Sequence, residues 1–150
     1  MRKYTHLGAY GLIVDNNCIV LVKKAKGPYT GLLDLPGGTI EYGEKPYDTV
    51  IRELKEEVGV EVKDYELFDT DSVLYDYEHK GEKQVIHHIG VFYKINSYNG
   101  KIKKDIELDE INNDSLGAEF YLLSNLKEEE LSPIALMEIK KLGYRLRLKK

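Results

Sequence analysis

The sequence predicts an α/β fold in which a mixed β-sheet is packed against helices. Strand-like apolar runs come first, a helical segment with one apolar face follows, and further strand-like runs lead to a closing helical segment. This order of elements is typical of a mixed sheet with helices packed on it. The chain has 150 residues and contains no Pro/Gly/Ser-rich linker or internal repeat, so a single domain over residues 1–150 is expected.

The first elements are expected to be a hairpin and a short strand. The apolar runs Leu7 to Val14 and Cys18 to Val22 flank Asp15-Asn16-Asn17, and Asx residues tolerate the left-handed backbone of a tight turn. Residues 27–31 contain two glycines and a proline and predict a loop, which is followed by a strand over Leu32 to Leu35.

A helix is expected from about Pro46 to Val58, after an interruption of regular structure at Pro36-Gly37-Gly38. Pro46 suits the first helical turn, where its missing N–H costs nothing, and Gly59 suits the left-handed position just after a helix. Apolar residues recur between them at offsets of three and four, and they give the helix one apolar face: Tyr47, Val50, Ile51, Leu54 and Val58.

Beyond Gly59 the chain is expected to return to strands and to end in helical structure. The strand-like segments are Val60–Val62, Glu66–Tyr75, Val85–Ile95 and Glu119–Leu123. Helical structure is expected from Ser124 onward and over Pro133–Leu142.

Composition narrows the class of function. The formal charge of -4 and the pI near 5.6 disfavour binding to long nucleic acid, which needs a basic surface. They leave nucleotides open, because a bound metal reverses the local charge. Cys18 is the single cysteine, so an intrachain disulfide and a multi-cysteine zinc site are excluded. No stretch suits a signal peptide or a membrane span. A reducing cytoplasm without a membrane partner is therefore the default expectation, while the oligomeric state, a homodimer included, stays open.

The predicted helix carries an acidic face opposite its apolar one. Glu53 lies three residues before Glu56 and four before Glu57, so the three carboxylates crowd one side and destabilise an isolated helix. They also lie near the helix C-terminus, where the helix dipole favours cations, and Arg52 cannot neutralise all of them. A hard divalent cation such as Mg²⁺ fits this need. Taken alone, the acidic face is more often simply solvated.

The segment from Gly38 to Val60 resembles the Nudix box, the signature of the Nudix hydrolase family. That pattern reads glycine, five residues, glutamate, seven residues, arginine-glutamate-aliphatic, one residue, two glutamates, one residue, glycine and an aliphatic residue. Leu35-Pro36-Gly37 extends the match, whereas Leu33 departs from the tryptophan that often stands there. Every position of the box is filled without a gap, by Gly38, Glu44, Arg52, Glu53, Leu54, Glu56, Glu57, Gly59 and Val60.

The resemblance implies an α/β/α sandwich with the box as a loop–helix–loop, and hydrolysis of a nucleoside diphosphate linked to another group. It implies that Mg²⁺, with Mn²⁺ as a substitute, is held mainly by Glu56 and Glu57, joined by Glu53 and the Gly37 carbonyl. Among these catalytic residues Glu53 is the first choice for the general base, with an acidic residue of a later loop as the alternative. Arg52 would hold the carboxylates in place. The residues expected to contact the substrate are Tyr10, Gly37, Gly38 and Glu44. Glu44 is also expected to be a supporting or outer metal ligand.

A later loop offers one more metal ligand. Residues 104–115 are rich in acids, and in this family a loop in a similar place often adds one carboxylate to the cluster. Asp109, Glu110 and Asp114 are the candidates, and Asp114 is favoured because it directly precedes the point where the chain re-enters a strand. A solvated acidic loop is the alternative for each of them.

Other residues are candidates for contact with the base or the phosphates. His87 and His88 are adjacent in a strand, so they face opposite sides of the sheet and cannot jointly bind a metal; structural roles are preferred, with one of them toward the substrate still open. A nucleobase needs a flat platform, which tyrosine can supply. The candidates for a site wall that contacts the base are Tyr10, Tyr29, Tyr75, Tyr77 and Tyr93. The candidates for contact with phosphates are Arg2, Lys23, Lys24 and Lys26, with simple solvation as the alternative.

The leading interpretation of the substrate is a nucleoside triphosphate or a related small nucleotide. Dinucleoside polyphosphates, nucleotide sugars and the 5′-pyrophosphate of RNA are alternatives, as is a non-catalytic nucleotide sensor, which the complete glutamate cluster disfavours. No proline stands between Pro46 and Pro133, which lowers the ADP-ribose interpretation, since that subfamily carries a downstream proline.

Overall fold

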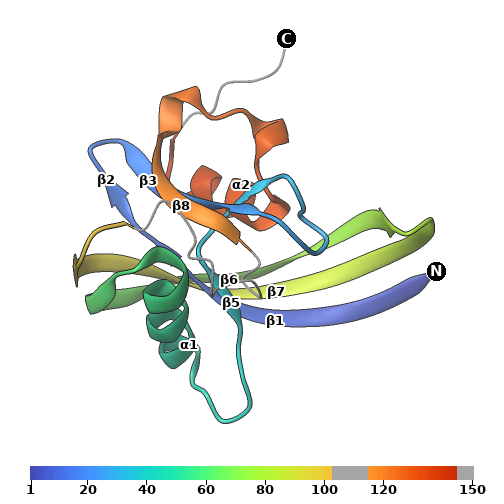
Figure 1. Cartoon of the computed structure of the whole chain (residues 1–150), viewed down its shortest axis with the longest axis horizontal. Coiled ribbons are helices and arrows are strands. Elements are labelled where there is room, and N and C mark those ends of the chain that lie inside the picture. The colour runs from blue at the N-terminus through green and yellow to red at the C-terminus, as the bar shows by residue number, and fades with distance from the viewer. Residues whose placement is uncertain (103–114, 145–150) are drawn as a thin grey trace.

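Two β-sheets lie between two helices in the computed structural model, which describes residues 1–102 and 115–144 (Figure 1). The first sheet has the order β5-β1-β7-β6, in which β1 and β7 are parallel and the other pairs antiparallel. The second is built on β3, which pairs antiparallel with β2, β4 and β8. The strands are β1 Arg2–Leu12, β2 Val14–Asp15, β3 Cys18–Lys24, β4 Leu33–Asp34, β5 Gly37–Thr39, β6 Glu61–His79, β7 Glu82–Asn99 and β8 Ser115–Leu122, and the α-helices are α1 Pro46–Glu53 and α2 Pro133–Lys141.

The helices cover opposite faces of the strands, which confirms the predicted α/β/α sandwich (Figure 1). Successive residues of a strand point to opposite faces, so β1 sends alternate side chains into two separate cores. The core beneath α2 contains Tyr10, Leu12, Ile19, Leu21, Phe92, Ile134 and Ile139. The core beneath α1 contains Ala9, Ile13, Val20, Val22, Val50, Leu54 and Ile95. In the described part of the chain, no helix is long and apolar enough to cross a membrane.

The turn residues behave as the sequence predicts at the first hairpin. Asn16 and Asn17 have φ of 50° and 64°, the left-handed backbone that a two-residue hairpin turn needs. The β6–β7 hairpin turns in the same way at Lys80 and Gly81, with φ of 52° and 79°. Its strands are longer than expected, because β7 continues beyond the core and pairs in parallel with the N-terminal half of β1.

Three predicted boundaries are corrected. Regular structure does not end at Pro36-Gly37-Gly38, since Gly37–Thr39 forms β5 and pairs with β1. The helix from Pro46 to Val58 is present, but its last five residues, Leu54–Val58, form a π-helical turn that ends at Gly59 with φ of 85°. From Ser124 onward the chain forms only the 3-10 turns Leu123–Asn125 and Glu128–Glu130 before α2.

A buried carboxylate on α2 has no part in the predicted site. Glu138 is fully buried, and neither of its oxygens has a hydrogen-bond partner among the described residues. Lys141 Nζ lies 3.6 Å from Glu138 Oε2 but contacts Asp69 and Asp71 more closely, at 2.5 Å each. Burial, reinforced by Asp69, raises the pKa of Glu138 to about 8.

Replacing Glu138 by glutamine is expected to stabilise the protein at high pH. Because the folded pKa lies above the unfolded one, wild-type stability is greatest below the unfolded pKa of 4.5 and falls as the pH rises toward 8. The neutral variant escapes this loss, so its free energy of unfolding should exceed that of the wild type by about 1–3 kcal/mol above pH ~8, and by much less near pH ~5. Urea unfolding at both pH values tests this, with Glu129→Gln on the exposed surface as the control. A difference that does not change with pH would contradict it.

Candidate active site

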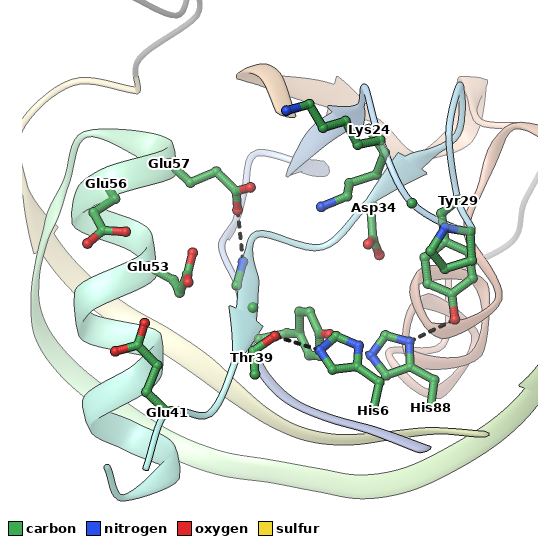
Figure 2. A pocket seen from close by; sticks show the side chains of 16 residues that line it. His6, Lys24, Tyr29, Asp34, Thr39, Glu41, Glu53, Glu56, Glu57 and His88 are labelled. Atoms are coloured by element: carbon green, nitrogen blue, oxygen red, sulfur yellow. Dashed lines mark hydrogen bonds between the residues drawn. The ribbon is translucent and has the colours of Figure 1, made fainter. Parts of the chain in front are cut away.

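A cavity of about 580 Å³ opens between α1 and the strands β4 and β5. One wall is acidic and comes from α1 and its π-helical turn, with Glu53, Glu56 and Glu57 (Figure 2). The facing wall carries Lys24 and Asp34 from the second sheet. The aromatic rings of His6, Tyr10, Tyr29 and His88 also line the cavity. The cavity thus joins a carboxylate wall to an aromatic one.

Glu57 ties the acidic wall to β5. Its side chain is 4% exposed, and its Oε1 accepts the N–H of Gly37 at 3.0 Å. Burial raises the pKa of Glu57 to about 7, against the opposing effect of Lys24 and of the Gly37 N–H. Burial likewise raises the pKa of Glu53, although Arg52 opposes it. The inner two carboxylates are therefore held where a negative charge is poorly solvated, and a nearby cation would stabilise both.

The two glycines of β5 allow the strand to run close to its neighbours. A Cβ on Gly38 would lie 2.7 Å from Glu53 Oε1, and a Cβ on Gly37 would lie 2.2 Å from the carbonyl oxygen of Ala9. Both glycines line the cavity, as their predicted contact with substrate requires. The group that Gly37 offers to the acidic wall in this structure is its N–H.

Arg52 holds two carboxylates at once. Its Nε donates to Glu44 Oε2 at 2.8 Å and one terminal nitrogen donates to Glu44 Oε1 at 3.0 Å, while the other donates to Glu53 Oε1 at 2.9 Å. These bonds, with help from the Glu41 N–H and the Thr49 hydroxyl, lower the pKa of Glu44 to about 2. Glu44 is not among the described residues that line the cavity. Its position favours the supporting role over direct contact with substrate.

His88 is the centre of the aromatic wall. It is buried, and its Nε2 and Nδ1 lie 2.5 and 2.7 Å from the hydroxyls of Tyr10 and Tyr29. His6 stacks on it with ring centroids 4.7 Å apart and contacts Thr39 Oγ1 through its own Nε2 at 2.8 Å. Burial lowers the pKa of His88 to about 3, so the ring stays neutral at ordinary pH. One nitrogen then donates to one tyrosine while the other accepts from the second.

Only some of the candidate aromatic and basic residues line the cavity. His87 and His88 face opposite sides of the sheet, as predicted, and only His88 lines this cavity. Of the five candidate tyrosines, Tyr10 and Tyr29 line it. Tyr75 contacts Tyr29 edge-on, Tyr77 donates a hydrogen bond to Gln84, and Tyr93 belongs to the α1 core. Among the basic candidates, Lys24 and Lys26 line the cavity.

Sequence reasoning missed Asp34 and His6. Asp34 is 3% exposed, and its Oδ1 accepts the Leu35 N–H at 2.8 Å and the Ser132 hydroxyl at 2.6 Å. Burial raises the pKa of Asp34, and Lys24 opposes this shift. One signal was available, since Asp34 is the single charged residue of the predicted strand Leu32 to Leu35. His6 gave none, because its place depends on the pairing of β1 with β7.

The donors on the acidic wall fit a hard divalent cation. All are carboxylate oxygens, which Mg²⁺ and Mn²⁺ accept readily, and the side chains of Glu53 and Glu57 are largely buried. Among the described residues, no three His, Cys, Asp or Glu side chains converge closely enough to enclose a metal by themselves. The proposed later ligands Asp109, Glu110 and Asp114 lie outside the described residues.

Comparison with known proteins identifies the family. The NUDIX domain family matches residues 5–140. An ADP-ribose pyrophosphatase of Methanocaldococcus jannaschii is 32% identical over 127 residues, which cover 83% of this chain and 68% of that protein. An 8-oxo-dGTP diphosphatase of Escherichia coli is 41% identical over 56 residues, which cover 37% of this chain and 43% of that protein. The crystal structure of a MutT NUDIX hydrolase from Burkholderia pseudomallei superposes with a TM-score of 0.70 at 22% identity, over 93% of this chain and 98% of that one. The chain therefore belongs to the NUDIX family.

Proposed function

We propose that this NUDIX protein is a pyrophosphohydrolase that uses a divalent cation to cleave a nucleoside diphosphate linked to a further group. The observation that carries the proposal is the cavity itself, in which a wall of glutamates faces aromatic rings and a lysine. The acidic wall suits metal-bound phosphates and the rings suit a base. The relatives named ADP-ribose pyrophosphatase and 8-oxo-dGTP diphosphatase support the same class of reaction.

The roles we propose rest on the positions of the glutamates and, for the Gly37 carbonyl and Asp114, on the resemblance of the sequence to the family. Glu56, Glu57 and Glu53 hold Mg²⁺, which Mn²⁺ can replace, together with the Gly37 carbonyl and Asp114. A bound divalent cation neutralises phosphate charge and lowers the pKa of water. Glu53 takes the proton of the attacking water, since its carboxylate borders the cavity and burial raises its pKa.

Two cationic residues support this reaction. Arg52 orients Glu53 through the hydrogen bond between them. Lys24 lies opposite the glutamates and supplies positive charge for the phosphates (Figure 2).

Two substrate classes are favoured by specific observations. The cavity volume of about 580 Å³ is typical of small-molecule sites, which supports a nucleoside triphosphate or a similar small nucleotide. ADP-ribose becomes the second candidate, despite the missing downstream proline, because the relative that acts on it by name matches 83% of this chain.

A panel of nucleotides tests the proposal. Canonical and oxidised nucleoside triphosphates, ADP-ribose, nucleotide sugars, dinucleoside polyphosphates and RNA with a 5′-pyrophosphate are incubated with Mg²⁺, with Mn²⁺ and with chelator, and released phosphate and pyrophosphate are measured. Turnover of at least one compound that stops with chelator is expected. Binding without turnover of any compound would contradict the proposal and favour the nucleotide sensor.

A further inference from the structure

We propose that Asp34 selects the base of the substrate by accepting hydrogen bonds from the donor edge of a guanine-type ring. This inference rests on the proposed function, because it concerns the part of the same cavity that lies opposite the glutamates. Asp34 stands at the end of β4, where it pairs with Val22. Figure 2 shows its carboxylate directed into the cavity below Lys24.

The two oxygens of Asp34 have different surroundings. Oδ1 accepts from the Leu35 N–H and from the Ser132 hydroxyl, and so uses both of its lone pairs. No described residue donates a hydrogen bond to Oδ2. A carboxylate that is 3% exposed costs considerable free energy unless its acceptors are used. Oδ2 therefore offers its lone pairs to a ligand in the cavity.

Ser132 fixes the direction in which that oxygen points. It is the N-terminal cap of α2, where its side chain accepts the Ala135 N–H at 3.2 Å while donating to Asp34 at 2.6 Å. Ser132 is fully buried, so this link joins the cavity to the core beneath α2. A carboxylate held in this way is pre-organised for a ligand, as a specificity contact requires.

The hydroxyl groups of the neighbouring tyrosines are already hydrogen-bonded, so Asp34 is the group we infer to contact the edge of the base. The hydroxyls of Tyr10 and Tyr29 are engaged with His88, and Tyr29 and His88 lie nearly parallel, with 17° between their planes. Of the four aromatic rings that line the cavity in the described part of the chain, His6 is the one that is not fully buried, and it stacks on His88; rings of this kind pack well against a base. A base lying there turns an edge toward Asp34, a residue that only accepts.

The chemistry of the acceptor favours guanine over adenine. Guanine has an N1–H beside its 2-amino group, so two neighbouring donors face the carboxylate. On adenine the 6-amino group lies beside the lone pair of N1, which a carboxylate repels. A site built to bond a donor rejects an analogue that lacks it, because its buried acceptor is then left unpaired.

Nucleoside monophosphates test this inference without relying on hydrolysis. Titration calorimetry with chelator present compares GMP with IMP, which lacks only the 2-amino group. The wild type is expected to bind GMP about tenfold or more tightly than IMP. Asp34→Asn keeps the volume and the two anchoring bonds at Oδ1 but replaces Oδ2 with an amide donor, so the ratio should fall to about one. Asp15→Asn, an exposed change in the first hairpin, should leave the ratio unchanged.

The ratio of two dissociation constants is independent of the fraction of protein that is correctly folded. If Asp34→Asn cannot be purified, the wild type is titrated with 1-methyl-GMP instead. This nucleotide should bind at least about tenfold more weakly than GMP. An unchanged ratio in Asp34→Asn, or equal binding of the three nucleotides to the wild type, overturns the inference. If the panel shows hydrolysis but the GMP/IMP ratio does not depend on Asp34, this inference alone is contradicted. If Asp34 selects the base but no nucleotide is hydrolysed, the proposed reaction alone is contradicted.

Discussion

Replacing Glu53 by glutamine is expected to lower kcat by about 10²- to 10⁴-fold at saturating substrate and Mg²⁺. The glutamine keeps the acceptor oxygen that Arg52 bonds at 2.9 Å, so the network around Arg52 and Glu44 should survive. It cannot take a proton from water, and this is the step that the proposed base performs. KM should change little, because the substitution removes an interaction that matters in the transition state.

Glu57→Gln tests a residue that we propose as a metal ligand but not as the base. Glu57 bonds the Gly37 N–H through Oε1, and glutamine can keep that bond while losing the charge. For this variant the Mg²⁺ concentration that gives half-maximal rate should rise by about 10- to 100-fold, with part of kcat regained at high Mg²⁺. Glu129→Gln, at an exposed residue that does not line the cavity, serves as the control in both titrations. Near wild-type kcat in Glu53→Gln would exclude Glu53 as the base, and unchanged Mg²⁺ dependence in Glu57→Gln would remove Glu57 from the ligands.

Features that depend on neighbouring residues in the chain could be predicted from sequence. The helix after Pro46 rests on apolar spacing and on a glycine that ends it, and both are local. The turn at Asn16 and Asn17 is equally local. Alternation along a strand was enough to separate His87 from His88. The acidic wall was found for the same reason, since its glutamates lie within one short helical segment.

The aromatic wall could not be predicted because it depends on long-range pairing. His6 meets His88 only because β1 runs parallel to β7 in one particular register. Asp34 is oriented by Ser132, which is 98 residues further along the chain. A shift of one residue in the β1–β7 register would turn His6 to the opposite face, and nothing in the local sequence fixes that register. The sequence signs of the acidic wall were thus local, while those of the aromatic wall were not.

The same distinction explains the error at β5. A Pro-Gly-Gly sequence commonly interrupts regular structure, and here its second residue instead allows a strand to approach β1. Tyr10 pairs with Gly37, and a Cβ at Gly37 would lie 2.7 Å from the Tyr10 Cα. Glycine is needed for space as well as for its backbone angle.

Gly37→Ala is therefore expected to be among the most destabilising single substitutions in the chain. The new Cβ would lie 2.2 Å from the Ala9 carbonyl oxygen, and a φ of 146° is one that residues with side chains rarely adopt. Both obstacles are backbone atoms or backbone angles, so a side-chain rotation cannot relieve them. We expect the free energy of unfolding to fall by about 3 kcal/mol or more, measured as the urea midpoint.

Gly81→Ala separates the two causes. Gly81 has φ of 79° and nothing within 4 Å of an added Cβ, so only the backbone angle opposes the substitution, at a cost of about 1–2 kcal/mol. Equal losses in the two variants would mean that β5 does not approach β1 as closely as described. A larger loss at Gly37, together with a raised Mg²⁺ requirement in whatever protein remains folded, would show that this contact also positions Glu57, whose carboxylate is anchored on the Gly37 N–H.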